Sequence, residues 1–321
     1  MYIVSDAICE EVFSRSDAFG AVEAVFAAMA SGEAHNFPVI REQLDYQDAI
    51  YGFKSGFDRA GLSLGLKSGG YWPNNAEKGL TNHQSTVFLF DPDTGKLHAL
   101  IGGNYLTAIR TAAASAVSIA HLARDDVRVM GMLGAGHQSV FQLRAALEQR
   151  SFEKVIGWNL HPEELDRLAA VADEASLPFE AVEREQLGAE ADVLITITSA
   201  HEALLLNDWI KPGTHIACMG TDTVGKQEID AAIFGRATVF TDEIAQAISI
   251  GETQHAFAQN IVGEADIIAI GNVINGEHAG RSNDDEVTVF DGTGVGLQDL
   301  AAASASLRAA IEQGKAISID L

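Results

Sequence analysis

The chain has 321 residues, 47% of them hydrophobic and 21% charged, as is typical of a soluble globular enzyme. Its formal net charge of -24 argues against nucleic acid or an anionic membrane as a partner, because both would repel it. The two cysteines form no disulfide framework, and neither a signal-peptide pattern nor an apolar run of membrane-spanning length is present. We therefore expect a soluble cytoplasmic protein.

The first third of the chain predicts a domain of helices and a largely antiparallel or mixed sheet. Residues 5–30 have helical periodicity. Short strand-like runs at 86–90 and 97–101 flank the turn sequence at 91–95, which indicates a hairpin. An alanine-rich helix is predicted over 107–123, and the boundary to the next domain is expected there.

From Val127 onward, strand-like and helical segments alternate, which predicts an α/β fold with a Rossmann-type, doubly wound parallel sheet. A final helix over 298–313 follows the last strand and is expected to return to the first domain. The strand-like runs are 127–133, 155–159, 193–198, 215–219, 237–241 and 286–290.

The glycine turn after the first of these strands predicts a dinucleotide site. Gly134 permits a tight turn, and Gly136 lets a pyrophosphate approach the backbone at the start of the next helix. Ser139 replaces the third glycine, so the motif reads G-x-G-x-x-S. An ordinary strand-to-helix turn is the alternative, but the surrounding strand, helix and second strand favour the dinucleotide.

The end of the second strand favours NAD over NADP. Asn159 stands where an acidic residue would bind the ribose hydroxyls of NAD, and it can still hydrogen-bond one of them. No arginine follows the strand to bind a 2′-phosphate, although His161 would partly serve if protonated.

Three basic residues in the acid-rich first domain make a plausible carboxylate site. Arg41 follows an apolar run, Lys67 lies in a glycine-rich segment, and Arg110 is predicted at the start of the alanine-rich helix. An arginine at a helix N-terminus opposes the helix dipole unless both serve the same anion. Taken singly, Arg41 and Lys67 fit solvated surface charges as well.

Asp222 and His83 are further candidates with ordinary alternatives. Asp222 follows a strand of the parallel sheet, where such folds bind ligands, and it could orient or protonate a reacting nitrogen or simply cap its loop. His83 is more typical of a loop histidine than of a site residue. No H-x-x-x-H or C-x-x-C spacing occurs, so we expect no metal.

Taken together, these segments resemble the ornithine cyclodeaminase/mu-crystallin family over essentially the whole chain. The resemblance begins at Arg41. Its further segments are GLKSGGYWPNN around Lys67, LTAIRTAAASA around Arg110, MLGAGHQS, ITITSA, MGTDTVGKQEID around Asp222 and DEVTVFDGTGVGLQDLAAA. The RTAA and GxDxxGKxE segments are more specific to the family than the glycine motif.

The resemblance implies a homodimer with two domains. Residues 1–120 with 296–321 would form an α+β substrate-binding and dimerisation domain, and 121–295 an NAD-binding domain. Arg41, Lys67 and Arg110 would hold the substrate carboxylate. The expected NAD contacts are Gly134, Ala135, Gly136, His137, Gln138, Ser139, Asn159, Thr198, Ser199, Met219, Gly220, Thr293 and Gly294.

The family runs several chemistries, and we expect NADH-dependent reduction of a small anionic imine, iminosuccinate, to L-aspartate. Lys67 or Asp222 would supply or position the proton. A second substrate carboxylate would meet Lys67 or Arg41, helped by His83 or the hydroxyl of Ser68. The alternatives are an alanine dehydrogenase, an ornithine cyclodeaminase-type enzyme and a ligand-binding protein without turnover.

Overall fold

The computed structural model describes residues 1–320, which form two compact units. The first unit comprises Met1–Arg110 and the chain from Val295 onward, and the second comprises Thr111–Gly294. The second unit is thus an insertion, in sequence, within the first. The functional domain boundaries predicted near residues 120 and 295 stay a proposal.

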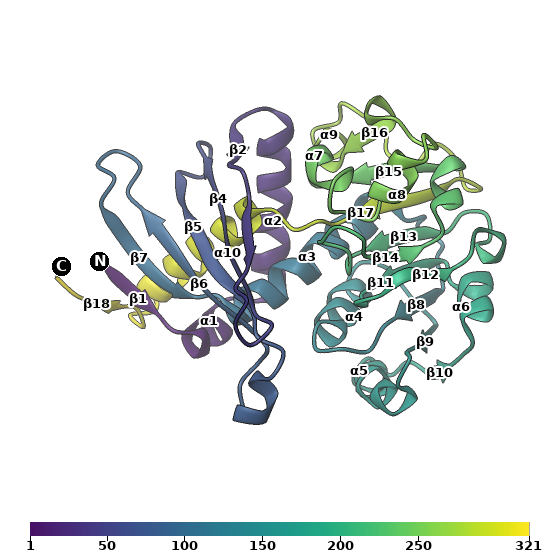
Figure 1. Cartoon of the computed structure of the whole chain (residues 1–321), viewed down its shortest axis with the longest axis horizontal. Coiled ribbons are helices and arrows are strands. Elements are labelled where there is room, and N and C mark those ends of the chain that lie inside the picture. The colour runs from purple at the N-terminus through teal and green to yellow at the C-terminus, as the bar shows by residue number, and fades with distance from the viewer. Residues whose placement is uncertain (321) are drawn as a thin grey trace. The chain divides into compact units, whose positions relative to one another are not determined.

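The first unit is a mixed sheet with helices. Strand β1 pairs in parallel with β7, whereas β7, β6, β5 and β4 form an antiparallel succession, as predicted for this half of the chain (Figure 1). The order is β18-β1-β7-β6-β5-β4-β2, and β3 also pairs with β4. Its elements are β1 (Tyr2–Val4), α1 (Asp6–Val12), α2 (Arg15–Ala30), β2 (Ala34–Asn36), β3 (Ile40–Gln43), β4 (Ile50–Asp58), β5 (Ser63–Tyr71), η1 (Asn75–Lys78), β6 (His83–Phe90), β7 (Leu97–Gly102), the start of α3 (Asn104–Leu122), α10 (Gly296–Glu312) and β18 (Ile317–Ser318).

The helical region predicted over 5–30 is two helices rather than one. The helix is interrupted at Phe13 and Ser14, and Ser14 is the N-cap of α2. Its hydroxyl accepts from the N–H of Asp17, whose carboxylate accepts from the N–H of Ser14 at 3.0 Å. This reciprocal capping box starts a new helix where periodicity alone suggested a continuous one.

Helix α10 packs closely on one face of this sheet, and glycines make the close approach possible. A Cβ on Gly65 would lie 2.2 Å from the carbonyl oxygen of Phe88 and 3.0 Å from the side chain of Leu300. Gly56 faces Leu297 in the same way. The opposite face carries apolar side chains that stay partly exposed, including Tyr51, Phe53, Leu66 and Phe88.

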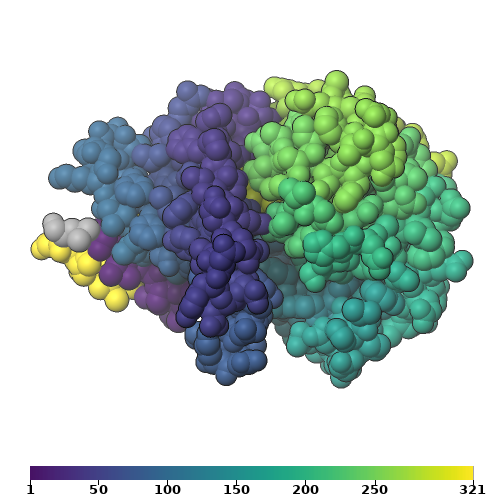
Figure 2. Space-filling model, viewed as in Figure 1, coloured from purple at the N-terminus to yellow at the C-terminus, as the bar shows by residue number. Residues whose placement is uncertain are grey.

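The two ends of the chain meet in this unit. Tyr2 of β1 pairs with Ser318 of β18 in an antiparallel register, and the amino group of Met1 donates to the carbonyl oxygen of Ile319 at 3.0 Å. Figure 2 shows the first residues, in purple, beside the last ones, in yellow.

The second unit contains an eight-stranded sheet in the order β10-β9-β8-β11-β13-β17-β15-β16, with every pair parallel (Figure 1). The predicted Rossmann-type sheet is confirmed. Its elements are β8 (Val129–Leu133), α4 (Ser139–Leu147), β9 (Lys154–Trp158), η2 (Pro162–Leu165), α5 (Asp166–Glu174), β10 (Phe179–Ala181), α6 (Arg184–Glu190), β11 (Val193–Thr196), β12 (His201–Leu205), η3 (Asn207–Trp209), β13 (His215–Cys218), β14 (Gln227–Ile229), η4 (Ala231–Gly235), β15 (Ala237–Thr241), α7 (Ile244–Ala247), α8 (Gln254–Ala258), η5 (Glu264–Asp266), β16 (Ile267–Ala269), α9 (Ile270–Ile274) and β17 (Val287–Asp291).

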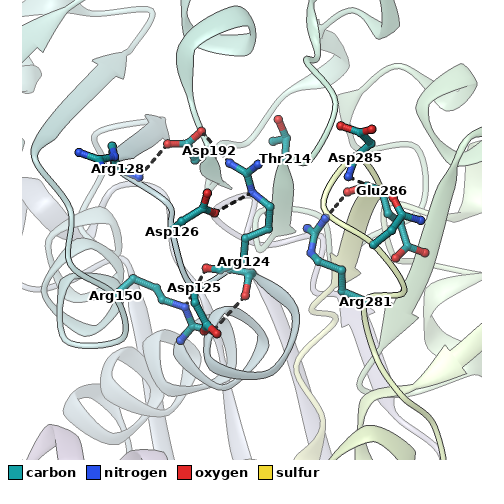
Figure 3. Close-up of polar contacts among 12 residues, drawn as sticks. Arg124, Asp125, Asp126, Arg128, Arg150, Asp192, Thr214, Arg281, Asp285 and Glu286 are labelled. Carbon is teal, nitrogen blue, oxygen red and sulfur yellow. Dashed lines mark hydrogen bonds and ion pairs between the residues drawn. The ribbon is translucent and has the colours of Figure 1, made fainter.

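A group of charged contacts in this unit lies at the amino ends of the strands, away from the carboxyl ends that bind ligands in such folds (Figure 3). Asp192 accepts from the N–H groups of Arg128 and Val129 at 2.8 and 2.9 Å, which fixes the start of β8 against that of β11. Arg124 and Lys211 balance its charge at 3.5 and 2.7 Å. We interpret this network as structural.

Candidate active site

The first unit buries two of the predicted cations against one carboxylate. The side chains of Lys67, Arg110 and Asp299 are each at most 7% exposed. Lys67 Nζ donates to Asp299 Oδ1 at 2.9 Å and lies 2.8 Å from Oδ2. Arg110 Nε donates to the same Oδ1 at 2.9 Å. Strand β5 and helices α3 and α10 therefore converge on a single ionic cluster.

Neutral polar groups complete the shell around these charges. Arg110 Nη1 donates to Gln298 Oε1 at 2.9 Å, and Lys67 Nζ donates to Thr107 Oγ1 at 3.3 Å. The Gln298 side chain is fully buried, and its Nε2 has no hydrogen-bond partner within residues 1–320. A buried amide donor without a protein partner can be satisfied by an oxygen of a bound ligand.

Burial and neighbouring charges shift the pKa values of this cluster. Burial lowers the pKa of Lys67 to about 7, and Asp299 opposes this effect only in part. Burial alone would raise the pKa of Asp299, but the positive charges of Arg110 and Lys67 outweigh it and lower that pKa to about 2. Asp299 is therefore ionised at neutral pH, whereas Lys67 changes its protonation there.

His83 lies in the same environment, but its imidazole is not protonated at neutral pH. It begins β6 opposite Tyr71, and β6 places it on the same face as Val87, which pairs with Lys67. Burial, followed by the charge of Lys67, lowers its pKa to about 4, so it is neutral at pH 7. Its expected help to a carboxylate is thus limited to a hydrogen bond, since a protonated imidazole is not available.

The structure corrects two expectations about neighbouring residues. Ser68 follows Lys67 in a strand and so faces the opposite side of the sheet, where its hydroxyl lies 2.6 Å from that of Tyr51. Arg110 is not at the start of its helix, because α3 begins at Asn104. The helix dipole argument therefore does not apply to Arg110, whose anionic partner is Asp299.

Arg41 and a lysine that we had not considered lie on the same sheet face as Lys67. Arg41, on the exposed strand β3, pairs with Gly52 of β4, two residues before Lys54. Lys54 lies directly opposite Lys67, and its charge helps to lower the pKa of Lys67. The direct contacts of Lys67 and Arg110 thus bring together two of the three predicted cations, with Arg41 further along the face.

In the second unit, the glycine turn has the geometry expected for a pyrophosphate. Gly134 has φ +108°, a conformation that disfavours any side chain, and an added Cβ on Gly136 would meet nothing within 4 Å. Gly136 and His137 are exposed, and no hydrogen bond within residues 1–320 uses their N–H groups. Ser139, at the start of α4, is buried and donates to the carbonyl oxygen of Gly136 at 2.7 Å.

The end of the second strand is organised by Asn159. Its Oδ1 accepts from the N–H of Ala135 at 3.1 Å, and its Nδ2 donates to the carbonyl of His161 and to Glu164, both at 2.9 Å. Arg167 donates to the carbonyl oxygen of Ala135 at 3.3 Å. Leu160 follows Asn159 at the strand end, but Arg167 of α5 reaches the turn at Ala135 from further along the chain.

Buried carboxylates hold the loops that carry the other expected NAD contacts. Glu228 accepts from the N–H groups of Thr198 and Gly220, and Asp242 accepts from those of Thr293 and Gly294. Ser199 is exposed in this loop region, whereas Met219 is buried. The carboxyl ends of β11, β13 and β17 are thus fixed by acids that the sequence analysis missed.

Two further acids extend this arrangement. Glu252 accepts from the N–H groups of Glu228 and Ile229 at 2.7 and 2.8 Å and from the hydroxyl of Thr221. Asp291 accepts from the N–H of Thr253 at 2.8 Å. Burial, with the charge of Glu228, raises the pKa of Glu252 to about 8, and burial raises that of Asp291 to about 7.

Asp222 lies in the loop after β13 and is paired with a lysine. Its Oδ1 accepts from Lys226 Nζ at 2.9 Å and from the hydroxyl of Thr223 at 3.2 Å. The side chain is 39% exposed. Both roles considered from the sequence, a reacting carboxylate and a loop partner, are compatible with this geometry.

The residues missed by the sequence analysis share one property. Asp299, Glu228 and Glu252 act through contacts between segments far apart in the chain, and Arg110 and Asp299 are separated by 189 positions. Only Asp299, in GLQDL, and Glu228, in GKQE, lie in segments with a family resemblance. Within residues 1–320, no cluster of potential metal ligands is found, and no helix is long and apolar enough to cross a membrane.

Comparison with known proteins gives consistent matches over the chain. The model of the ornithine cyclodeaminase/mu-crystallin family matches residues 1–313. Iminosuccinate reductase of Paracoccus denitrificans (strain Pd 1222) is 57% identical over 321 residues, which cover 100% of each chain. Its crystal structure in complex with NAD+ superposes with a TM-score of 0.97 and covers 100% of this chain and 99% of that one.

A more distant structure has the same architecture. An archaeal alanine dehydrogenase dimer with bound NAD is 28% identical, with a TM-score of 0.93, and covers 100% of this chain and 99% of that one. The fold of both units is therefore shared with enzymes that act at the carbon–nitrogen bond of small amino acids or their imines.

Proposed function

Because the chain belongs to the ornithine cyclodeaminase/mu-crystallin family, we propose that it is an NADH-dependent imine reductase that converts iminosuccinate to L-aspartate. Identity of 57% over the full length of iminosuccinate reductase supports this reaction more strongly than the 28% identity supports alanine dehydrogenation. The chemistry of the first unit supplies an independent argument.

The observation that carries the proposal is the excess of positive charge around Asp299. Burying cations is costly unless anions compensate them, and this cluster places the charges of Lys67, Arg110 and Lys54 around one carboxylate. A substrate with two carboxylates suits such a site better than a monocarboxylate. Arg110 and Lys67 hold one carboxylate of the substrate, and the free amide donor of Gln298 satisfies an oxygen.

Lys67 also provides the proton. Reduction of C=N adds a hydride at carbon and a proton at nitrogen, and bound NADH supplies the hydride. With a pKa of about 7, Lys67 is present in both protonation states at neutral pH, which suits a general acid. Asp299 keeps the ammonium group in place between Thr107 and its own carboxylate. Asp222 remains our candidate for orienting the nitrogen.

The second unit fits NAD by its own geometry. The exposed N–H groups of Gly136 and His137 are free to bind a pyrophosphate, and the positive φ of Gly134 keeps the turn tight. Ala135, Gln138 and Ser139 complete that turn. Asn159, Thr198, Ser199, Met219, Gly220, Thr293 and Gly294 remain the proposed contacts at the other strand ends.

We also propose that the chain forms a homodimer through the open face of the first sheet. Helix α10 covers the other face, whereas Tyr51, Phe53, Leu66 and Phe88 stay partly exposed as one apolar surface. Contiguous apolar surfaces of this kind mark protein interfaces. The alanine dehydrogenase with the same fold is described as a dimer.

The reaction is tested by following NADH absorbance with oxaloacetate plus ammonia, which form iminosuccinate, and with pyruvate plus ammonia. We expect a higher catalytic efficiency with oxaloacetate. Equal or higher efficiency with pyruvate would assign the enzyme as an alanine dehydrogenase instead. Ammonia release from ornithine without a net change in NADH would indicate a cyclodeaminase.

A further inference from the structure

Glu164 lies beside the glycine turn of the second unit although it is not at the end of the second strand. It belongs to η2, and its Oε2 accepts from Asn159 Nδ2 at 2.9 Å. Asn159 Oδ1 in turn accepts from the N–H of Ala135, within the turn itself. Two hydrogen bonds therefore connect the carboxylate of Glu164 to the backbone that receives the pyrophosphate.

Asn159 has no free N–H and a single remaining acceptor lone pair to offer a ribose. Both hydrogens of its Nδ2 are used, one by the carbonyl of His161 and one by Glu164. Its oxygen already binds Ala135. The acceptor needed by a ribose hydroxyl is better provided by the carboxylate of Glu164, whose side chain is 34% exposed.

We propose that Glu164 binds the adenosine ribose of NADH and excludes NADPH. This assignment rests on the proposed use of a nicotinamide dinucleotide by this unit. A carboxylate near the end of the second strand accepts hydrogen bonds from the ribose hydroxyls in folds of this type. The same carboxylate repels a 2′-phosphate, which carries nearly two negative charges at pH 7.

Arg167 is the reason that the carboxylate of Glu164 affects the preference between NADH and NADPH. Its Nη1 lies 3.6 Å from Glu164 Oε1 and also donates to the carbonyl oxygen of Ala135. An arginine at this place would otherwise be a phosphate ligand. Glu164 pairs with it, so the site offers no net positive charge to a 2′-phosphate.

The other side chains near the strand end do not provide this selectivity. Leu160 is apolar and exposed, and the carboxylate of Glu163 lies 4.0 Å from the His161 ring rather than at the turn. Arg184 stacks on the ring of Trp158, with its guanidinium carbon 5.2 Å from the ring centroid. Glu164 is the carboxylate that contacts both Asn159 and Arg167.

The test is a direct titration of the purified protein with NADH and with NADPH, followed by fluorescence or calorimetry. Glu164→Gln keeps the shape and an oxygen acceptor for Asn159 but removes the charge. Glu163→Gln removes a neighbouring charge that is 76% exposed and serves as the matched control. Unchanged circular dichroism and an unchanged urea unfolding midpoint show that each variant is folded, and we expect Glu164→Gln to bind NADH more weakly because an amide is a poorer acceptor for the ribose hydroxyls.

We expect the Kd for NADPH of Glu164→Gln to fall by about tenfold or more, with Arg167 now available to the phosphate, while Glu163→Gln behaves as wild type. Equal NADPH affinity in wild type and Glu164→Gln overturns the assignment, as does an equal gain in both variants. The ratio of the two Kd values requires no turnover. It therefore stays informative if the imine substrate proves to be different, which only the activity assay reports.

Discussion

Asp299 determines how the two buried cations of the first unit are placed. Both Lys67 and Arg110 contact its Oδ1 at 2.9 Å, from a strand and a helix that both precede it in the chain. Because the carboxylate is fully buried, it can be removed only at the cost of leaving two buried charges without their anion. The effect of Asp299 on the pKa of Lys67 can be measured separately from its effect on the stability of the fold.

We expect Asp299→Asn to lower the pKa of Lys67 further below about 7, since the negative charge that favours the ammonium form is lost. Affinity for a non-reactive dicarboxylate such as succinate requires charged Lys67. In the wild type its Kd therefore rises as the pH increases through about 7, and in the variant the rise begins at a lower pH. Calorimetric titration with succinate between about pH 5 and 9 spans the range in which Lys67 titrates. It measures the pH midpoint of the change in affinity for the wild type and for the variant.

His83 and Arg110 do not interfere with this measurement. The pKa of His83 is about 4, below the range of the titration, and arginine stays protonated throughout. The same midpoint in wild type and variant would show that Asp299 does not control the charge of Lys67.

Asp222→Asn distinguishes a reacting carboxylate from a loop partner. If Asp222 orients or protonates the substrate nitrogen, we expect turnover to fall by about 10²- to 10⁴-fold, with NADH affinity retained. Lys226→Met removes the 2.9 Å ion pair while leaving the carboxylate in place. Comparable losses of turnover in both variants would show that Asp222 stabilises its loop and does not act on the substrate.

The sequence predicted the cations of the site better than their anion. Lys67 and Arg110 lie in segments with a family resemblance, so each could be recognised locally. Asp299 lies within the apolar sequence of α10, and its significance comes from contacts with residues 189 and 232 positions away. Glu164 escaped notice because Asn159, rather than the acid, occupies the strand end.

At the scale of elements, close packing of α10 on β4 and β5 positions the cluster. We expect Gly65→Ala to lower the free energy of unfolding by about 1–3 kcal/mol, because the added Cβ would meet Phe88 and Leu300. Gly20→Ala in α2, where an added Cβ meets nothing within 4 Å, should raise it by about 0.5–1 kcal/mol. Urea unfolding of the two variants measures both effects.

Gly65→Ala should also weaken succinate binding, because a shift of α10 moves Asp299 away from Lys67. A variant with lowered stability but wild-type affinity would show that the cluster does not depend on this packing. Gly20→Ala serves as the control for affinity, since α2 contributes no residue to the cluster.

The parallel strands of the second unit and the β6–β7 hairpin followed from the sequence, whereas β4, β5, the break at Ser14 and the short elements did not. The hairpin of β6 and β7 and the six predicted strands of the second unit matched their apolar runs to within three residues at each end. Strands β10 and β16 and the pair β12–β14 have only three to five residues each, too few for a periodicity to show. The capping box at Ser14 divided a helix that periodicity had joined.

At the scale of the whole molecule, the proposed dimer depends on the open sheet face. Phe53→Glu places a charge on that face, where the native side chain is 37% exposed, and should convert the dimer to monomers. Light scattering after gel filtration measures the mass. Leu206→Glu changes a residue of the second unit with similar exposure, 41%, and should leave the mass unchanged.

A dimer that persists in Phe53→Glu with its wild-type mass and stability would place the interface elsewhere. A shift to monomers in both variants would point to a general loss of stability rather than to this face.

The pairing of β1 with β18 has a consequence for biosynthesis. Strands β1 and β18 belong to one sheet, and all of the second unit is translated between them. On the ribosome, the second unit can fold as soon as its last strand emerges, whereas the first must wait for α10 and the final residues. A nascent chain stalled before Val295 would thus carry an incomplete first unit, with Lys67 and Arg110 still lacking their carboxylate. Binding of the proposed substrate therefore requires that α10 has been synthesised.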